Sequence, residues 1–337
     1  MVVGWCGLVN VTIIGLGLIG GSVARACAEQ KLMVSSWDPN PDTRAAARAW
    51  GIPVAESREA AVEHADLVVV ATPLVAMEQT FQWLAQCAPP QAVITDVGSV
   101  KEPVIAHAVA HGVGDRFVAG HPMAGAESSG FDAASSSLFR GATWAVTPLP
   151  LTQVDRVLVV ARFVMGVLGA RVMFLTPDIH DAGVALVSHV PHVLAHELRG
   201  VVGQDRHGRV AQALAAGSFR DMTRVARGDA VRNAAMVWEN RDQVSRVLDV
   251  MIADFTDLRR VLGSASDQGD VEAFFTRGGT VSESDRAHAT LTVTQDTPVS
   301  VLTALGELGH LVVALTDVDD QPGHGAHLTF AAHHGVS

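Results

Sequence analysis

The 337-residue chain contains no tyrosine, only three cysteines and few basic residues. Cys6, Cys27 and Cys87 have no regular spacing and cannot form a disulfide framework, so we expect a reducing, cytoplasmic setting. The 24 Lys and Arg residues against 35 Asp and Glu residues give a formal net charge of −11, with no basic stripe. This balance excludes a non-specific nucleic-acid binder. Without tyrosine, no phenol hydroxyl can act as an acid or a base.

The chain also lacks a run of about 20 uninterrupted apolar residues, so we expect no membrane association. Residues 1–24 carry no charge, but a signal peptide needs a basic segment before its apolar stretch, and the first basic residue is Arg25. A strand followed by a glycine turn explains the segment better. Hydrophobic residues make up 48% of the chain and charged residues 18%. These fractions indicate a globular protein, with room for domains of roughly 150 residues each.

Short apolar runs alternate with helical patterns through the first half of the chain. We expect strands at residues 9–14, 34–37, 67–71, 92–95 and 116–119, and helices at 22–31, 43–50, 77–87 and 104–111. The run at 67–71 shows no polar alternation, as in a strand covered on both faces. Repeated βα units predict an α/β fold, with a Rossmann-type, doubly wound parallel sheet over residues 1–150.

The pattern changes after residue 150. Helical patterns occupy residues 151–169, 178–202, 209–216 and 234–262, and predict an all-α domain over residues 151–263. The apolar face of its long last helix predicts a homodimer; burial within one chain is the alternative. Residues 264–337 begin like a linker and continue as a β-α-β-β pattern at 289–294, 299–308, 311–316 and 328–331. This third region resembles a shortened regulatory ACT-type module.

The segment at residues 15–20 reads GLGLIG, a G-x-G-x-x-G between an expected strand and an expected helix. That context is the dinucleotide-binding fingerprint, in which a pyrophosphate meets a helix N-terminus. Asp38 ends the next strand, where it would bind ribose hydroxyls and repel a 2′-phosphate. We therefore expect NAD, with NADP as the alternative through nearby Arg44; a plain glycine turn is the non-binding alternative. The candidate cofactor-binding residues are Gly15, Gly17, Leu18, Ile19, Gly20, Asp38, Thr72, Pro73 and Ser99.

A histidine follows the last expected strand of this sheet. In open α/β sheets, ligands bind beyond the carboxyl ends of the strands, which is where we expect His121. A histidine there can accept a proton from a hydroxyl during hydride transfer. An imidazole with an unperturbed pKa of about 6.5 is neutral at neutral pH, as this role requires. A purely structural histidine is the alternative.

The longer segment around this histidine, GHPMAGAESSG at residues 120–130, resembles the active-site signature of the prephenate and arogenate dehydrogenases of tyrosine biosynthesis. TDVGSVK at 95–101, SHVPH at 188–192 and FRDMTRVA at 219–226 agree with that family and occur in its order. The resemblance implies NAD-dependent oxidative decarboxylation of prephenate to 4-hydroxyphenylpyruvate, or of arogenate to tyrosine. Another Rossmann enzyme, such as a 3-hydroxyacid dehydrogenase, and an NAD-sensing regulator are the alternatives.

The resemblance also implies roles for single residues. His121 and Ser99 are the catalytic candidates, with Ser99 between the histidine and the nicotinamide; alternatively, Ser99 forms a helix-capping box with Glu102. The planar guanidinium of Arg224 would bind a substrate carboxylate, and Asp221 would hold Arg224 in place. The further substrate-binding candidates are His192, Glu127 and Gly217.

Three histidines in the second part of the chain have the spacing of metal ligands on one helical face. They are His189, His192 and His196. No acidic or cysteine ligand accompanies them, and the implied chemistry needs no metal. We therefore expect no metal site.

Overall fold

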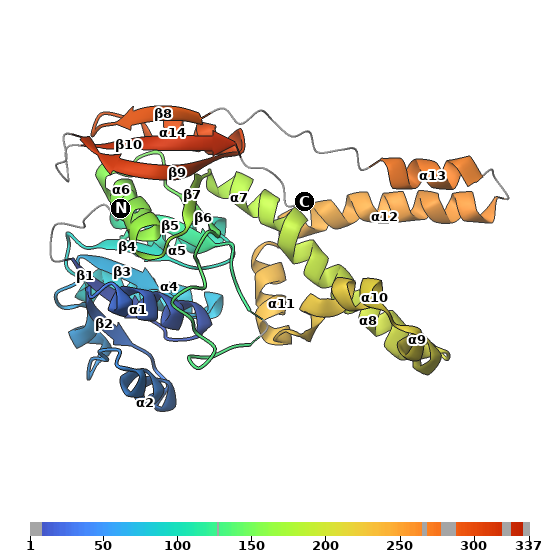
Figure 1. The fold of residues 1–337 in the computed structure, drawn as a ribbon, viewed down its shortest axis with the longest axis horizontal. Coiled ribbons are helices and arrows are strands. Elements are labelled where there is room, and N and C mark those ends of the chain that lie inside the picture. Colours follow the sequence, from blue (N-terminus) through green and yellow to red (C-terminus); the bar gives the residue numbers. More distant parts are fainter. Residues whose placement is uncertain (1–8, 127, 265–267, 278–287, 319–324, 333–337) are drawn as a thin grey trace. The chain divides into compact units, whose positions relative to one another are not determined.

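The computed structural model describes residues 9–126, 128–264, 268–277, 288–318 and 325–332 (Figure 1). Two of the residues discussed above, Cys6 and Glu127, lie outside these ranges. Contacts divide the chain into two compact units, Met1–Asp181 with Ala287–His333 and Ala182–Arg286 with His334–Ser337. In the described ranges, no helix combines the length and apolarity needed to cross a membrane.

The first unit contains the parallel sheet that the sequence predicts. Its strands, in the spatial order β2-β1-β3-β4, are β1 (Asn10–Ile14), β2 (Met33–Trp37), β3 (Leu67–Val70) and β4 (Val93–Asp96). The helices that connect them are α1 (Leu18–Glu29), α2 (Pro41–Trp50), α3 (Arg58–Val62), α4 (Leu74–Cys87) and α5 (Glu102–Ala110). Each expected helix is present within a few residues of its predicted bounds, and the short α3 is an addition.

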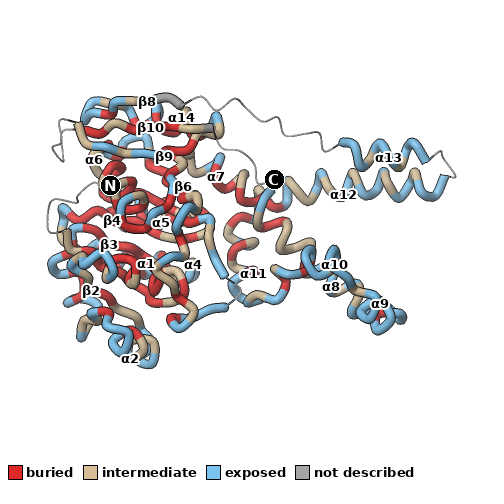
Figure 2. The backbone as a smooth tube through the Cα atoms, viewed as in Figure 1, coloured by how far each residue is buried: buried red, intermediate tan, exposed pale blue. Residues whose placement is uncertain are grey.

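Helices cover both faces of this sheet. Val11 and Ile13 of β1 pack in one hydrophobic cluster with buried residues of α1, whereas Ile14 packs in another with buried residues of α4 and α5. The alternation follows from the period of two in a strand. All residues of β3 are buried, as expected of a strand between two layers. Figure 2 shows this buried core as red strands.

A second, mixed sheet extends the first unit. Its strands, in the spatial order β5-β6-β7-β9-β10-β8, are β5 (Ala119–Pro122), β6 (Thr143–Thr147), β7 (Arg171–Phe174), β8 (His288–Val293), β9 (His310–Asp317) and β10 (Ala326–Ala332). A parallel bridge between Ile94 and Phe117 joins β4 to the segment that leads into β5. The expected strand at 116–119 therefore begins later, and His121 lies within β5 instead of after it.

The sequence prediction missed β7. The expected helix at 151–169 is α6 (Val154–Arg162) followed by a π-helical turn, Phe163–Val167. Gly169, with a φ of 66°, then turns the chain into β7, which pairs in parallel with β6. A left-handed φ favours glycine, because it lacks a Cβ. Because α6 and β7 pack within the first unit, this unit continues to Asp181 and does not end at our expected boundary after residue 150.

The C-terminal region has the predicted β-α-β-β order, with α14 (Val299–Glu307) after β8. Our expected boundaries treat residues 264–337 as a region of its own, but the structure includes its strands and α14 in the first unit. Strand β9 pairs with β7 between Val312 and Val172. A Cβ added at Gly306 of α14 would lie 1.7 Å from the backbone oxygen of Phe174, so the helix lies directly on β7.

The second unit is helical, as predicted. From the end of α7 (Pro177–Val184), a π-helical turn at Ala185–His189 leads into it. Its remaining helices are α8 (Val190–Gln204), α9 (Gly208–Leu214), α10 (Gly217–Thr223), α11 (Ala230–Glu239), α12 (Arg241–Gly263) and α13 (Gln268–Thr276). The expected single helix at 234–262 is broken at Asn240, whose backbone has a non-helical φ of −112° and ψ of 25° and whose side chain bonds to His189 3.0 Å away.

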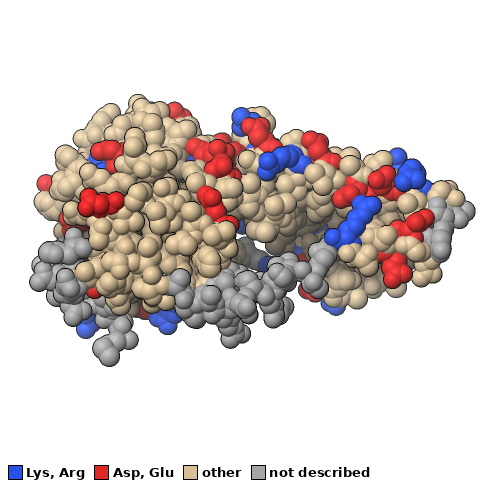
Figure 3. Space-filling view, turned by 90° about the horizontal axis from the view of Figure 1, so that it is seen from above, with Lys and Arg blue, Asp and Glu red and all other residues tan. Residues whose placement is uncertain are grey.

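The second unit has a small hydrophobic core and exposes many large apolar side chains. Much of α12 and α13 is exposed (Figure 2). The exposed large apolar side chains on α12 include Val250, Ile252, Phe255 and Leu262. On the face of the molecule drawn in Figure 3, described acidic and basic side chains are interspersed and form no continuous basic stripe.

Candidate active site

The carboxyl ends of the parallel strands bring the predicted cofactor residues to one edge of the sheet. Gly15, with a φ of 93°, follows β1, and a Cβ there would lie 2.6 Å from the backbone oxygen of Ala71 after β3. A Cβ at Gly20 would lie 1.9 Å from the oxygen of Gly15. A Cβ at Gly17 would meet nothing within 4 Å, so open space lies beside the start of α1. Gly15 and Gly20 therefore allow segments of the backbone to pack closely, and Gly17 leaves space for a ligand beside the start of α1.

The other predicted cofactor residues lie at the same edge. Leu18 and Ile19 form the first turn of α1, whose N-cap, Gly17, has no side chain to bind the first amides. Such amides at a helix N-terminus bind phosphate well. Thr72 follows β3, and Pro73 is the N-cap of α4. This edge of the sheet, which carries Gly15, Gly17, Gly20, Thr72 and Pro73, fits the pyrophosphate of a dinucleotide, and we call it the cofactor edge.

Asp38 holds the turn after β2 close to the glycine loop. Its Oδ2 accepts a hydrogen bond from the amide of Leu16 at 2.8 Å, and its Oδ1 accepts one from the amide of Asn40 at 2.9 Å. Each carboxylate oxygen has further acceptor capacity, so ribose hydroxyls can still bind. Arg44 donates to the backbone oxygens of Asp38 (2.7 Å) and Pro39 (3.0 Å).

A fully buried ion pair lies under the end of β4. The Nζ of Lys101 donates to Asp96 Oδ2 at 2.5 Å and to the backbone oxygen of Gly120 at 2.7 Å, and both side chains of the pair are 0% exposed. Asp96 also accepts from the amides of Gly98 (2.8 Å) and Gly120 (3.0 Å). Burial lowers the pKa of Lys101, and the charge of Asp96 opposes that shift. One carboxylate thus fixes both the loop that carries Ser99 and the strand that carries His121.

The half-buried His121 is held by a second histidine that our sequence prediction missed. Its Nδ1 lies 2.9 Å from Nε2 of His180, and the Nδ1 of His180 lies 2.7 Å from Oδ1 of Asp181. His180 and Asp181, both in α7, are 2% and 1% exposed. Burial lowers the pKa of His180 below its ordinary value, although the bond to Asp181 opposes the shift. His180 is therefore neutral at neutral pH.

The capping box predicted from Ser99 to Glu102 is absent. Helix α5 begins at Glu102, its N-cap is Lys101, and Asp181 of α7 accepts hydrogen bonds from the amides of Lys101 (2.7 Å) and Glu102 (2.9 Å). A carboxylate at a helix N-terminus is stabilised by both the amides and the helix dipole. Ser99 is half-buried in the loop before this helix, at the cofactor edge.

The predicted substrate-binding residues lie in the second unit. Arg224 begins a short 3₁₀ turn (Arg224–Arg227) after α10, which carries Asp221 and begins at Gly217. The side chains of Arg224 and Asp221 are both exposed. His192 in α8 donates from Nδ1 to the backbone oxygen of Ser188 at 2.8 Å. Because an imidazole that donates from Nδ1 accepts at Nε2 when neutral, His192 presents an acceptor nitrogen.

The three histidines with metal-ligand spacing have separate hydrogen-bond partners. Nδ1 of His189 pairs with Asn240, and Nε2 of His196 lies 3.2 Å from Nδ2 of Asn233. Among the described residues, no three His, Cys, Asp or Glu side chains are placed to hold a metal ion together.

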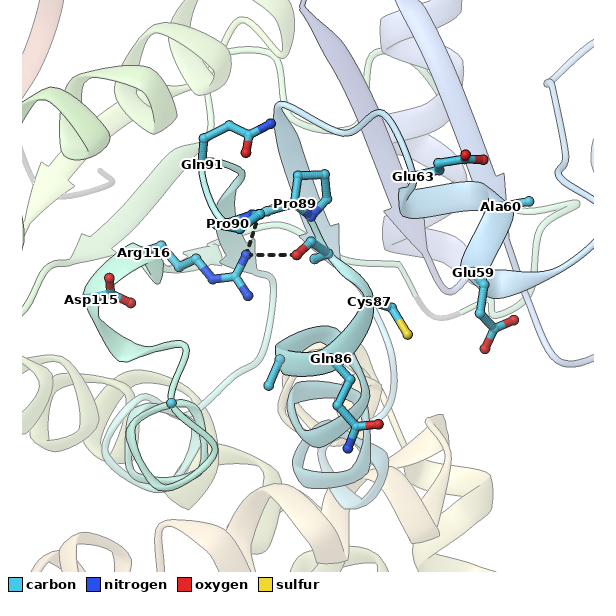
Figure 4. A pocket seen from close by; sticks show the side chains of 13 residues that line it. Glu59, Ala60, Glu63, Gln86, Cys87, Pro89, Pro90, Gln91, Asp115 and Arg116 are labelled. Carbon is cyan, nitrogen blue, oxygen red and sulfur yellow. Dashed lines mark hydrogen bonds between the residues drawn. The ribbon is translucent and has the colours of Figure 1, made fainter.

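A hollow of about 1010 Å³ lies away from these residues, where the chain enters β3, β4 and β5 (Figure 4). Arg116 at its wall donates to the backbone oxygens of Pro89 (2.5 Å) and Ala88 (3.3 Å). These bonds tie the end of α4 to the segment before β5. The hollow is at the amino ends of the strands, opposite the cofactor edge.

Two family models match consecutive parts of the chain. Residues 20–174 match the model described as prephenate dehydrogenase, nucleotide-binding domain, and residues 176–276 match prephenate dehydrogenase, dimerization domain. Cyclohexadienyl dehydrogenase from Zymomonas mobilis is 36% identical over 269 residues, which cover 77% of this chain and 90% of that protein. The chain belongs to the prephenate dehydrogenase family. The predicted family, the fold class and the assignment as a dehydrogenase are thereby confirmed.

Solved structures of related proteins agree with the architecture. The structure of prephenate dehydrogenase from A. aeolicus in complex with hydroxyphenyl propionate and NAD⁺ matches with a TM-score of 0.74 and 27% identity, over 81% of this chain and 96% of that one. Arogenate dehydrogenase from Synechocystis matches with a TM-score of 0.69 and 26% identity, over 80% and 98% of the two chains. Both family models end before the C-terminal sheet region of this dehydrogenase.

Proposed function

We propose that this dehydrogenase catalyses the NAD-dependent oxidative decarboxylation of prephenate to 4-hydroxyphenylpyruvate. The observation that carries the proposal is His121, which β5 presents at the cofactor edge with its Nδ1 held by His180. A histidine in that position is suited to accept a proton from a substrate hydroxyl. The match of both family models and the ligands in the A. aeolicus structure support the choice of substrate and cofactor.

The proposed reaction removes one hydride and carbon dioxide from the substrate, and the hydroxyl proton that His121 accepts returns to the phenolate oxygen of the product. His121 accepts the proton of the ring hydroxyl, and the carbon that bears this hydroxyl becomes a carbonyl as its hydride leaves. When bound, NAD supplies the acceptor for that hydride. The ring carboxylate then departs as carbon dioxide, and its bonding electrons complete the aromatic ring. Ser99 bonds to the reacting hydroxyl and orients it toward His121.

Residues of the family's motifs carry the proposed recognition of the substrate. Arg224 binds the side-chain carboxylate, because its planar guanidinium can donate two parallel hydrogen bonds. His192 contributes an acceptor nitrogen, and Asp221 and Gly217 border the carboxylate. We assign Glu127, from its motif alone, to the polar surroundings of the substrate.

We propose NAD, and not NADP, as the cofactor. The carboxylate of Asp38 accepts one amide hydrogen bond at each of its oxygens, and each oxygen has further acceptor capacity for a ribose hydroxyl. A 2′-phosphate beside Asp38 would meet like charge. The Nη1 of Arg44 donates to two backbone oxygens of the turn after β2, so this nitrogen is already engaged within the protein.

Arogenate is the second candidate substrate. It differs from prephenate by an amino group in place of the side-chain keto group, and the likeness to the Synechocystis arogenate dehydrogenase favours including it. In that case the product would be tyrosine. The assignment of Arg224 to the side-chain carboxylate applies to both substrates.

A paired assay tests the proposal. The purified protein is incubated with prephenate or arogenate and with NAD or NADP, and the absorbance of the reduced nicotinamide is followed. We expect turnover with prephenate and NAD; no reduction with either ring acid would refute the assignment. As a matched variant, His121→Asn should bind NAD unchanged and lose about 10²–10⁴-fold in kcat. A variant that keeps its kcat would remove His121 from its assigned role.

We also propose that the enzyme is a homodimer that forms through the second unit. The family model for this unit is a dimerization domain, and α12 exposes Ile252, Phe255 and Leu262. Exposed apolar side chains that cluster on one element are typical of an interface. Light scattering coupled to size-exclusion chromatography should give twice the 35.4 kDa mass of one chain, and Phe255→Glu should yield the monomer. A wild-type monomer at micromolar concentration would contradict this.

A further inference from the structure

Three side chains from two elements form a continuous hydrogen-bonded line. His121 lies in β5, and His180 and Asp181 are consecutive residues of α7. The line runs from Nδ1 of His121 to Nε2 of His180 (2.9 Å) and from Nδ1 of His180 to Oδ1 of Asp181 (2.7 Å). The two imidazole rings meet edge to face, with centroids 5.1 Å apart and an angle of 69° between planes.

The chemistry of the three groups fixes where each proton lies. An ionised carboxylate only accepts hydrogen bonds, so Nδ1 of His180 donates to Asp181. The Nε2 of a neutral His180 is then an acceptor, so Nδ1 of His121 donates to it. The remaining nitrogen of His121, Nε2, carries its lone pair and is the basic nitrogen. Neutral imidazole in water favours the opposite tautomer, with the proton on Nε2.

We propose that His180 and Asp181 are positioning residues that hold His121 in the tautomer required of a general base. The inference rests on the function proposed above, since it assigns His121 the substrate proton. Proton transfer to Nε2 turns His121 into an imidazolium whose Nδ1–H still donates to His180. The acceptor nitrogen of His180, polarised by Asp181, stabilises that cation at the moment it forms.

The surroundings of His180 favour this arrangement. His180 is 2% exposed, and the charged side chains facing it are Asp181, Lys101 and Asp96. Lys101 and Asp96 form their own ion pair, which leaves Asp181 as the carboxylate bonded to the ring. Asp181 is fixed in turn by the amides of Lys101 and Glu102 at the start of α5. A helix N-terminus therefore orients the last group of the line.

Two substitutions of His180 test the proposal by kinetics. His180→Phe keeps a planar ring and removes both nitrogens, whereas His180→Gln keeps a carboxamide that can accept from His121. We expect His180→Phe to lower kcat by about 10²-fold, the lower bound for a lost general base. NAD binding should be unchanged, and His180→Gln should recover part of the loss. His111→Phe, which removes a histidine of the first unit outside the site, is the matched control and should behave as the wild type.

The pH profile distinguishes positioning from a merely structural role. The acid limb of kcat reports protonation of the base in the enzyme–substrate complex. Because His180 stabilises the imidazolium of His121, replacing His180 should make His121 less basic and move the acid limb to lower pH. The charged groups that face His180, namely Asp181, Lys101 and Asp96, are retained in both variants. A lower kcat with an unmoved limb, an unchanged kcat, or equal losses for His180→Phe and His180→Gln would each overturn the proposal.

A spectroscopic measurement needs neither substrate nor turnover. Long-range ¹H–¹⁵N spectra of the ¹⁵N-histidine-labelled wild-type protein, with His121 assigned through His121→Asn, report its tautomer. We expect the proton on Nδ1 and an unprotonated Nε2; a proton on Nε2 would overturn the proposal even if the variants failed to fold. If neither prephenate nor arogenate were oxidised, the proposed function would fail, while the spectrum would still report on the line of hydrogen bonds.

Discussion

Substitution of Lys101 by methionine should cost the first unit a large part of its stability. Methionine has a similar length and no charge, so the space remains filled while the carboxylate of Asp96 loses its cation. Both side chains are 0% exposed and their charged atoms are 2.5 Å apart. Removing one partner of such a pair costs about 3–5 kcal/mol, because an uncompensated charge stays buried. The backbone oxygen of Gly120 also loses a donor 2.7 Å away.

The assay is urea unfolding followed by circular dichroism, with the free energy of unfolding taken from linear extrapolation. The exposed pair Arg48–Glu56, with side chains 44% and 94% exposed, is the matched control. Arg48→Met should cost about 0–1 kcal/mol, as exposed pairs do. The double variant Lys101→Met/Asp96→Asn removes the stranded charge but leaves one acceptor oxygen for the amides of Gly98 and Gly120, so it should recover part of the stability that Lys101→Met loses. A cost for Lys101→Met no larger than for Arg48→Met would refute the reasoning.

Three further predictions follow from single side chains. Asp38→Ser should raise KM for NAD about 10- to 100-fold, since hydrogen bonds to a charged group contribute about 1.5–3 kcal/mol; an unchanged KM in steady-state kinetics would contradict the assignment. Burial raises the pKa of Cys27 to about 12, so peptide mapping after iodoacetamide treatment of the native protein should find Cys87 modified and Cys27 intact. Burial also lowers the pKa of His180, so the unfolded chain binds a proton that the folded chain does not. The free energy of unfolding should therefore fall as pH drops below about 6.5, and less so in His180→Phe; equal pH dependence in urea titrations would count against it.

The cofactor edge could be predicted from the sequence because its signals are local. A short buried strand, a glycine turn and a helix start lie within residues 9–29, and Asp38 ends the next strand. The parallel pairing of β1 with β2 and β3 then brings distant segments to one edge without further information. The position of His121 followed from the same rule, although the strand begins later than its apolar residues indicate.

The partners of His121 could not be predicted in this way. His180 lies 59 residues further along the chain, and nothing in its local pattern separates it from a surface histidine. The same holds for Asp181, which caps α5 across 80 residues. The local sequence favoured a capping box from Ser99, but a carboxylate from α7 binds the same amides and leaves Ser99 in the loop. Tertiary contact overrides a local propensity here.

The C-terminal region packs into the hydrophobic core of the first unit. It lies beyond the residues that the family models match, yet Leu302, Leu328 and Phe330 pack in the same hydrophobic cluster as strands β6 and β7. Glu307 accepts a hydrogen bond from Thr176 at 3.1 Å, and the backbone oxygen of Thr176 accepts from the amide of His180 at 3.0 Å. The region is therefore part of the core that holds the start of α7. Removal of the region should therefore disturb the start of α7 and, with it, the position of His180.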